Sequence, residues 1–262
     1  MRWDPEAEQA IQKVPFFVRK KVRKKVEAHA GQKGRSSVSL SDVEDLRKKF
    51  LSKGGMEKEV RGFEAAACFG GAGCPNCAAP CEDLAGEIEE LLEKADIRSF
   101  LKAHVKTGLK FHHEFRVVLS DCPNACSRPQ IADVGILGAS VPGVSDEPCS
   151  QCRACVETCP EQAVFLDENS GRPEIDPETC LSCGKCIRVC PTGTLMEKKK
   201  GYRVLLGGRL GRHPRLGMEV PGIHTREEVL MILKKAIEFY KTHSTKGRRF
   251  SQILDSIDQI AG

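Results

Sequence analysis

Fourteen cysteines carry most of the chemistry that the 262-residue sequence can offer. All of them lie between residues 68 and 190, which is less than half of the chain. The sequence opens with Met1-Arg2-Trp3-Asp4-Pro5-Glu6 and has no apolar stretch of the kind that a secretory signal needs, so we expect a cytoplasmic protein. Cytoplasmic thiols are kept reduced, and this many of them predict metal or redox chemistry rather than structural disulfides.

Two runs of cysteines repeat one spacing, and each ends in Cys-Pro. The runs are Cys149-x2-Cys152-x2-Cys155-x3-Cys159-Pro160 and Cys180-x2-Cys183-x2-Cys186-x3-Cys190-Pro191. The doubled pattern resembles bacterial two-cluster ferredoxins, where the fourth cysteine of each run binds the other cluster. It predicts two [4Fe–4S] clusters that relay electrons. The first ligand set is Cys149, Cys152, Cys155 and Cys190, and the second is Cys159, Cys180, Cys183 and Cys186. C-x2-C pairs also bind zinc, but the third cysteine and the Cys-Pro ending, both present twice, favour clusters.

The six remaining cysteines are Cys68, Cys74, Cys77, Cys81, Cys122 and Cys126. The segments ACFGGAGCP and DCPNACSRPQIADVGILG, which carry a C-x5-C and a C-x3-C pair, resemble the siroheme and [4Fe–4S] binding region of sulfite and nitrite reductases. The resemblance implies that Cys68, Cys74, Cys122 and Cys126 bind a third [4Fe–4S] cluster. It also implies that the Cys126 thiolate bridges this cluster to the siroheme iron. A disulfide or a zinc site at Cys122 and Cys126 is the alternative.

The order of the motifs extends this resemblance over residues 60–262. In anaerobic and dissimilatory sulfite reductases a two-cluster ferredoxin unit follows the same tail, and the chain then resumes with a Leu-Gly-Gly-Arg segment, found here at Leu206–Arg209. The family implies an α+β fold. Residues 60–145 and 200–262 are expected to form a sulfite reductase-like α/β domain, and residues 146–196 a ferredoxin-like 2[4Fe–4S] insert.

Siroheme carries many carboxylates, and their burial requires cationic hydrogen-bond donors. The candidate cofactor-binding residues are Arg128, Arg209, Arg212 and Arg215. Arg203 and Lys198–Lys200 are further candidates close by in the sequence. Taken singly, each of these side chains is equally compatible with a solvated surface charge.

Two features depart from the reductase pattern. These reductases have a ferredoxin-like half-domain before the C-x5-C pair, whereas here only residues 51–67 separate a helical module from Cys68. We therefore expect a partner subunit or a second copy to complete the siroheme pocket. Cys77 and Cys81 are additional cysteines, and they are either buried free thiols or members of an alternative ligand set.

Residues 1–52 are predicted to form a small helical module. Helices are expected over Pro5–Lys13 and Phe16–Ala30, and Ser41-Asp42-Val43-Glu44 resembles a capping box for a third that reaches Phe50. The spacing of WDPEAEQAIQKVPFFVRKKVRKKVEAHA resembles the small C-terminal domain found in one of the subunits of light-independent protochlorophyllide reductase. It implies a docking or stabilising module, and Lys53-Gly54-Gly55 is a plausible linker.

Other elements follow from residue periodicity in the larger part of the chain. Leu84, Ile88, Leu91 and Leu92 have helical spacing, and FRVVLS at 115–120 and Tyr202–Leu206 are predicted strands. Thr225–Glu228 is a capping box for a helix, and one last helix is expected to place Phe250, Ile253, Leu254, Ile257 and Ile260 on one side.

The sequence supports two functions of different class. The first is an iron–sulfur oxidoreductase of sulfite/nitrite reductase type, which receives electrons from a donor protein or redox subunit. The second is a non-catalytic electron-transfer subunit with three [4Fe–4S] clusters and no siroheme. Arg19–Lys25 is a basic run in a chain of net charge +5, but a solvated helix face explains it better than nucleic-acid binding. No stretch reaches the ~20 apolar residues of a membrane span.

Overall fold

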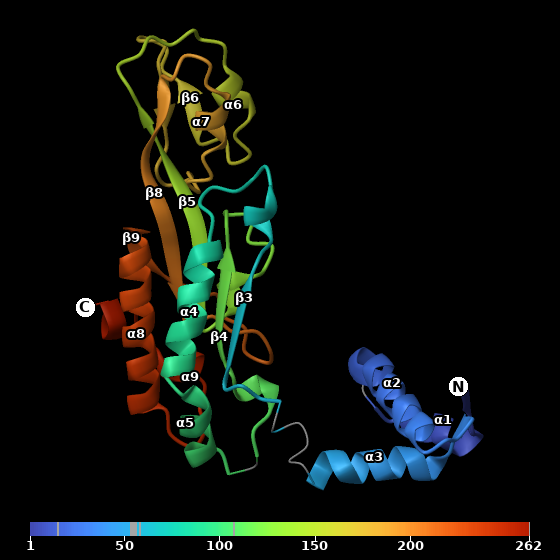
Figure 1. Cartoon of the computed structure of the whole chain (residues 1–262). Helices are drawn as coiled ribbons and strands as arrows, with labels where there is room; N and C mark the ends of the chain where they lie inside the picture. Colours follow the sequence, from blue (N-terminus) through green and yellow to red (C-terminus); the bar gives the residue numbers. More distant parts are fainter. Residues whose placement is uncertain (15, 53–56, 58, 107, 262) are drawn as a thin grey trace. The chain divides into compact units, whose positions relative to one another are not determined.

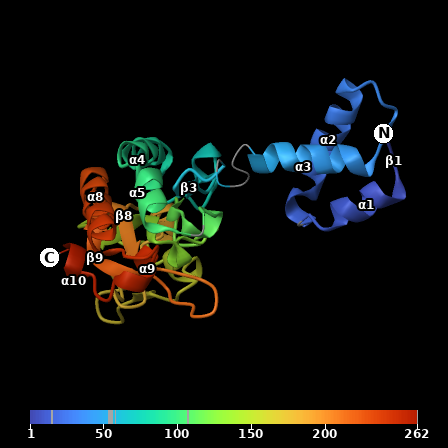
Figure 2. The ribbon, with the colours of Figure 1, turned by 90° about the horizontal axis from the view of Figure 1, so that it is seen from below.

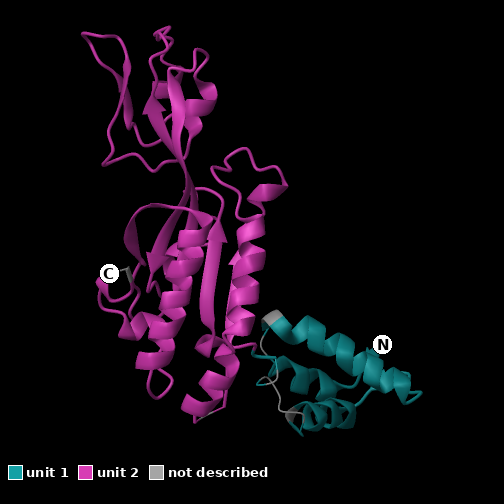
Figure 3. Cartoon of the chain, turned by 60° about the vertical axis from the view of Figure 1, so that its left-hand side comes forward, with its two compact units in different colours: residues 1–60 teal, residues 61–262 magenta. Residues whose placement is uncertain are grey.

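The chain forms two compact units, Met1–Val60 and Arg61–Gly262 (Figure 3). The structure is a computed structural model that describes residues 1–14, 16–52, 57, 59–106 and 108–261. The linker expected at Lys53–Gly55 lies outside the described residues.

The N-terminal unit contains the three predicted helices. Its elements are β1 (Arg2–Trp3), α1 (Pro5–Gln12), α2 (Phe16–Gln32), β2 (Ser37–Val38) and α3 (Leu40–Ser52). The two short strands pair in parallel, and Ala7, Val26, Ala30 and Val38 form the buried core. Trp3 packs over this core, donating from Nε1 to Glu27 Oε1 at 2.9 Å. The lysines of α2 at 20, 21, 24 and 25 are exposed, as expected of a solvated helix face.

The start of α3 differs from the prediction. Asp42, rather than Glu44, accepts hydrogen bonds from the backbone N and the hydroxyl of Ser39, at 3.0 and 2.8 Å. Arg35 pairs with the same carboxylate at 2.8 Å. Burial alone would raise the pKa of Asp42, but these bonds hold it at about 2. The capping residue is therefore Ser39, because Asp42 lies three positions after it and Glu44 does not.

A five-stranded mixed sheet is the centre of the larger unit. Its strand order is β3-β4-β5-β8-β9, with β3, β4 and β5 parallel and β5, β8 and β9 antiparallel. The strands are β3 (Phe63–Ala67), β4 (Phe115–Ser120), β5 (Val134–Val144), β8 (Leu195–Leu206) and β9 (Met218–His224). Both predicted strands are present, and the second begins at Leu195 rather than Tyr202 because β8 continues to pair with β5 as far as Val144.

Helices cover one face of this sheet (Figure 2). They are α4 (Glu82–Lys94), α5 (Ile97–His104) and α8 (Arg226–His243). Leu84, Ile88, Leu91 and Leu92 lie on α4 as predicted, and all but the half-buried Leu91 are buried. The capping box at the start of α8 is also confirmed, since Thr225 accepts from Glu228 N and Glu228 accepts from Thr225 N.

The prediction of a single last helix, made from the apolar spacing, is wrong. The segment contains α9 (Phe250–Ile253) and α10 (Asp258–Ala261), with a break between them. The carbonyls of Ser251 and Leu254 accept hydrogen bonds from Arg215 Nη2, both at 3.0 Å. Because Arg215 donates to these carbonyls, they need no further helical turn to supply N–H donors, and α9 can end there.

Strands β5 and β8 pair from Val134↔Leu206 to Val144↔Leu195, and this ribbon leads into the cysteine-rich insert (Figure 1). The insert contains α6 (Ala154–Glu157), the antiparallel pair β6 (Val164–Leu166) and β7 (Pro173–Ile175), and α7 (Lys185–Val189). Its small core consists of Cys155, Val164, Cys186 and Leu195. An α+β fold is therefore confirmed.

Replacement of Gly138 by Ala should destabilise the larger unit. A Cβ at this position of β5 would lie 2.4 Å from Ala79 O and 2.5 Å from Asp121 O, so the backbone would have to shift. We expect a loss of about 1–3 kcal/mol in the free energy of unfolding, measured by urea denaturation. Gly86→Ala, at an exposed position of α4 where nothing lies within 4 Å of a new Cβ, is the control and should stabilise the unit by about 1 kcal/mol. Equal effects of the two substitutions would contradict this packing.

Candidate iron–sulfur centres

The two cysteine runs of the insert share one backbone conformation around their second cysteine. The residues before and after Cys152, and before and after Cys183, all have positive φ. They are Gln151 (55°), Arg153 (60°), Ser182 (56°) and Gly184 (68°). Left-handed residues followed by helical ones turn successive N–H groups towards one side, forming a concavity of the kind that binds anionic groups and iron–sulfur clusters. The sequence repeat is thus also a repeat of backbone geometry.

Backbone N–H groups point at several of these sulfur atoms. Gln151 N donates to Cys149 Sγ, Ala163 N to Cys159 Sγ and Leu195 N to Cys190 Sγ, each at 3.3 Å. Such bonds stabilise a thiolate and tune the reduction potential of a cluster that it ligates.

The structure places the fourth cysteine of each run beside the other run. Burial raises the pKa of Cys155, and the neighbouring thiolates of Cys190 and Cys149 raise it further. In the other group, burial raises the pKa of Cys186 to about 12, with added repulsion from the thiolates of Cys180, Cys183 and Cys159. The first group contains three of the four cysteines of one predicted ligand set, and the second contains all four of the other.

A third group of cysteines lies at the ends of β3 and β4. Cys68 directly follows β3, Cys74 follows the short helix η2 (Gly70–Ala72), and Cys122 and Cys126 lie in the loop after β4. Burial raises the pKa of Cys122, as do the nearby thiolates of Cys126, Cys74 and Cys68. Asp121 N donates to Cys68 Sγ at 3.2 Å. Parallel strands β3 and β4 end at the same edge, which brings the two distant motifs together.

Cys126 is the exposed member of this third group, whereas Cys122 is buried. Ala125, directly before Cys126, has a φ of 54°, which repeats the left-handed position found before Cys152 and Cys183. The thiol that the sequence predicts as the bridge is thus the one presented at the surface.

Asp121 organises the loop that carries the upstream cysteines, and the sequence analysis did not single it out. Its side chain is 3% exposed, and its Oδ1 accepts from Cys81 N at 3.2 Å. Its backbone carbonyl accepts from Ala78 N and Ala79 N at 2.8 and 3.1 Å. Its position between β4 and Cys122 is the one signal that could have indicated a role at the centre.

The two additional cysteines differ in their surroundings. Cys81 is fully buried, and its thiol donates to Ser120 O and Ala79 O at 3.7 and 3.8 Å. Burial strongly raises the pKa of Cys81, and the nearby Asp121 carboxylate raises it further, so this cysteine remains a neutral thiol. Cys77 lies nearer the third group, with its Sγ 3.9 Å from Asp121 Oδ2.

The four candidate cofactor-binding arginines fall into two pairs. Arg209 donates to His213 O and Ser251 O, both at 2.8 Å. Arg215 donates to Gly207 O at 3.0 and 3.2 Å, and to the carbonyls before and after the end of α9. Arg128 and Arg212 are exposed. Arg209 and Arg215 thus hold the loop between β8 and β9 and the break after α9.

Residues 63–258 match the family described as "Nitrite and sulphite reductase 4Fe-4S domain". The chain belongs to this family. Residues 3–47 match a second family, "Proto-chlorophyllide reductase 57 kD subunit". Both resemblances found in the sequence are therefore confirmed, and the reductase-family chain is an iron–sulfur protein of sulfite/nitrite reductase type.

Two curated relatives of the reductase-family chain are sulfite reductases by name. "Coenzyme F420-dependent sulfite reductase" of Methanocaldococcus jannaschii is 33% identical over 81% of this chain and 32% of its own length. An "Anaerobic sulfite reductase" subunit of Salmonella typhimurium is 30% identical over 78% of this chain and 55% of its own length. The chain therefore spans about a third to about half of these relatives.

The fold is also that of a solved reductase. Dissimilatory sulfite reductase I aligns with a TM-score of 0.51 and 14% identity, over 76% of this chain and 50% of that one. At this identity the likeness concerns the fold alone.

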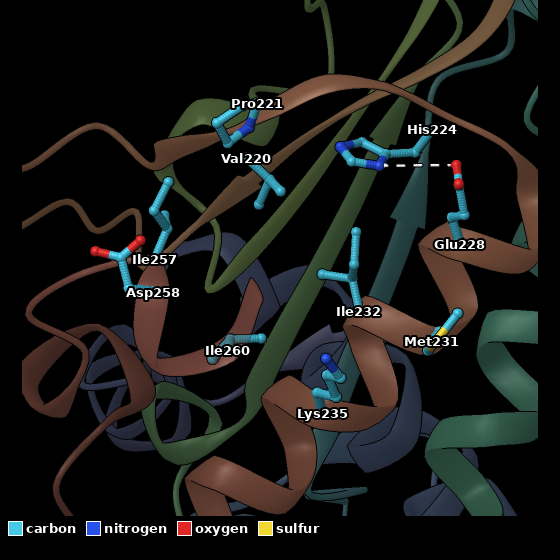
Figure 4. A pocket seen from close by; sticks show the side chains of 10 residues that line it. All are labelled: Val220, Pro221, His224, Glu228, Met231, Ile232, Lys235, Ile257, Asp258 and Ile260. Atoms are coloured by element: carbon cyan, nitrogen blue, oxygen red, sulfur yellow. Dashed lines mark ion pairs between the residues drawn. The ribbon is translucent and has the colours of Figure 1, made fainter. Parts of the chain in front are cut away.

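A cavity of about 410 Å³ in the reductase-family unit lies away from the cysteines, between β9, α8 and α10 (Figure 4). His224 Nδ1 and Glu228 Oε2 face each other in it at 3.9 Å, beside the half-exposed Met231. Among the described residues, no three His, Cys, Asp or Glu side chains are placed to hold one metal ion, and no helix is long and apolar enough to cross a bilayer.

Substitution of Cys122 should remove one centre and leave the other two. In protein purified without oxygen, Cys122→Ser is expected to lose about a third of the iron, because one of the three predicted clusters would lose a ligand. Cys81→Ala should keep the full iron content, because that thiol donates to carbonyls. Iron and acid-labile sulfide per chain are the measurements. An equal loss of iron in both variants would contradict this assignment.

Proposed function

We propose that the chain is an iron–sulfur oxidoreductase of sulfite/nitrite reductase type, built around a siroheme-coupled [4Fe–4S] centre. The observation that carries the proposal is the convergence of Cys68, Cys74, Cys122 and Cys126 at one edge of the sheet, with Cys126 at the surface. When bound, the clusters and the siroheme supply electrons one at a time to a multi-electron reduction of sulfite or nitrite. The family match and the two relatives support this chemistry.

The twelve cysteines of the three groups would hold three [4Fe–4S] clusters. Their donor chemistry fits, because thiolates are the ligands that iron–sulfur clusters require. The left-handed positions and the N–H···S bonds fit as well, since both stabilise negative charge on sulfur. In the insert, the third cysteine and the Cys-Pro ending, both present twice, favour clusters over zinc.

The siroheme would lie beside Cys126. We assign its direct contacts to Arg128 and Arg212, which are exposed and can pair with its carboxylates. Arg209 and Arg215, which the sequence also places in the cofactor site, would act by shaping the loop that carries Arg212, because their guanidinium groups donate to backbone carbonyls.

Electron donation and completion of the pocket are assigned to other proteins. One relative is named as a subunit, and the chain spans 55% of that relative's length. We propose a redox subunit or electron-donor protein that feeds the insert. A partner subunit or a second copy of the chain would cover the exposed side of Cys126 and add anion-binding groups.

A non-catalytic electron-transfer subunit with three clusters and no siroheme is the second candidate. The hydrogen bonding of Arg209 and Arg215 favours it, because two of the four expected cations already have backbone partners.

Extraction of tetrapyrrole distinguishes between the two candidate functions. Protein produced with siroheme supply and purified without oxygen is extracted with acid and acetone, and reduction of sulfite and nitrite is assayed with reduced methyl viologen. We expect extractable siroheme and turnover in the natural chain, and loss of both in Cys126→Ser.

In Arg128→Asn, which suits the φ of 64° at this position, we expect siroheme binding to weaken about tenfold. Lys234→Ala, at an exposed position of α8, removes the same charge and should leave siroheme binding unchanged. Full iron content with no tetrapyrrole in the natural chain would contradict the reductase and leave the electron carrier.

A further inference from the structure

The insert is joined to the sheet through one of its two cysteine runs. Ser140 of β5 donates from its backbone N to Ser182 O at 2.8 Å and forms a parallel bridge with Cys183. The contact is close, since a Cβ on Gly184 would lie 2.8 Å from Ser140 Oγ. Ser140 is itself 4% exposed. The loop around Cys183 is therefore fixed against the central sheet of the reductase-family unit.

Arg188 of α7 reaches from this loop to the third cysteine group. Its Nη1 donates to Cys183 O at 3.5 Å and to Cys77 O at 3.4 Å. Cys77 lies close enough to Cys122 and Cys68 for their thiolates to raise its pKa, after the larger effect of burial. One guanidinium group thus touches a cysteine loop of the insert and a cysteine loop of the sheet edge, 111 residues apart in sequence.

The other set of the insert has its N–H donors within the insert or at its boundary, not at the sheet edge. Cys152 is exposed, and the N–H groups that donate to Cys149 and Cys190 come from Gln151 and Leu195. The charged groups at the junction itself are Arg188, Lys200, which lowers the pKa of Cys77, and Arg203, which lies near Cys180. The carboxylates there are Asp121 and Glu197, and Glu197 accepts from Ser140 Oγ at 2.7 Å.

We propose that Arg188 is the positioning residue for electron transfer between the insert and the siroheme-type centre. It follows that the set Cys159, Cys180, Cys183 and Cys186 is the inner station, and that the set with exposed Cys152 receives electrons from a low-potential one-electron donor. The inference rests on the proposed function. Transfer across the junction moves one electron and makes or breaks no bond. Arg188 is exposed, and a cation placed between two centres favours the added electron on each of them.

Redox potentials measured centre by centre test this role. Holo protein is titrated potentiometrically and followed by low-temperature electron paramagnetic resonance, in the natural chain and in Arg188→Ala and Arg188→Lys. In R188A we expect the midpoint potentials of the inner and siroheme-type centres to fall by the equivalent of about a tenfold change in equilibrium constant, ~59 mV for one electron. The outer centre should not move, and R188K should restore the natural values because it keeps the charge.

Arg153→Asn is the matched control. Arg153 is exposed and directly follows Cys152, and Asn suits its φ of 60°. This substitution should shift the midpoint potential of the outer centre alone. Three loaded clusters whose potentials do not respond to R188A, or respond equally at all three centres, would overturn the role of Arg188 and leave the proposed function standing. A natural chain that cannot be loaded with three clusters would overturn both, and the iron content of the same samples shows which has failed.

Discussion

The convergence of buried thiols is the constraint on which the larger unit depends. Thiolates brought together away from water repel one another, and here burial and mutual repulsion raise the pKa of Cys122, Cys155, Cys180 and Cys186. In an unloaded chain these groups are therefore held as neutral thiols, and a bound cluster takes the place of their protons. The backbone contributes through left-handed residues beside the cysteines, which turn N–H groups towards sulfur. Metal loading and folding of the insert are therefore expected to be coupled.

The sheet and its ribbon position the three groups of cysteines. Parallel pairing of β3 and β4 places Cys68 beside the loop of Cys122 and Cys126, although the motifs are far apart in sequence. The long β5–β8 ribbon then leads to the insert, and Ser140 and Arg188 join the insert to that same edge. The placement of the cysteine groups thus depends on one strand edge and one ribbon, and helices cover one face of the sheet that carries them.

Much of this could be predicted because cysteine spacing is a local property. The C-x2-C-x2-C-x3-C-P runs define loops whose geometry repeats wherever the spacing repeats, and the capping box at Thr225 depends on residues three apart. Tertiary contacts could not be predicted from local sequence patterns. Apolar spacing alone predicted one helix after Phe250, because it could not show that Arg215 takes the carbonyls at its break. The roles of Arg209 and Asp121 were also not predictable from local patterns, because both depend on partners distant in sequence.

The metal and sulfide content of the natural chain, purified without oxygen, tests the central claim most directly. Three [4Fe–4S] centres predict about twelve acid-labile sulfides and at least about twelve irons per chain, with no stoichiometric zinc. About eight irons and eight sulfides would contradict the third centre at Cys68, Cys74, Cys122 and Cys126. Stoichiometric zinc without sulfide would contradict the account as a whole.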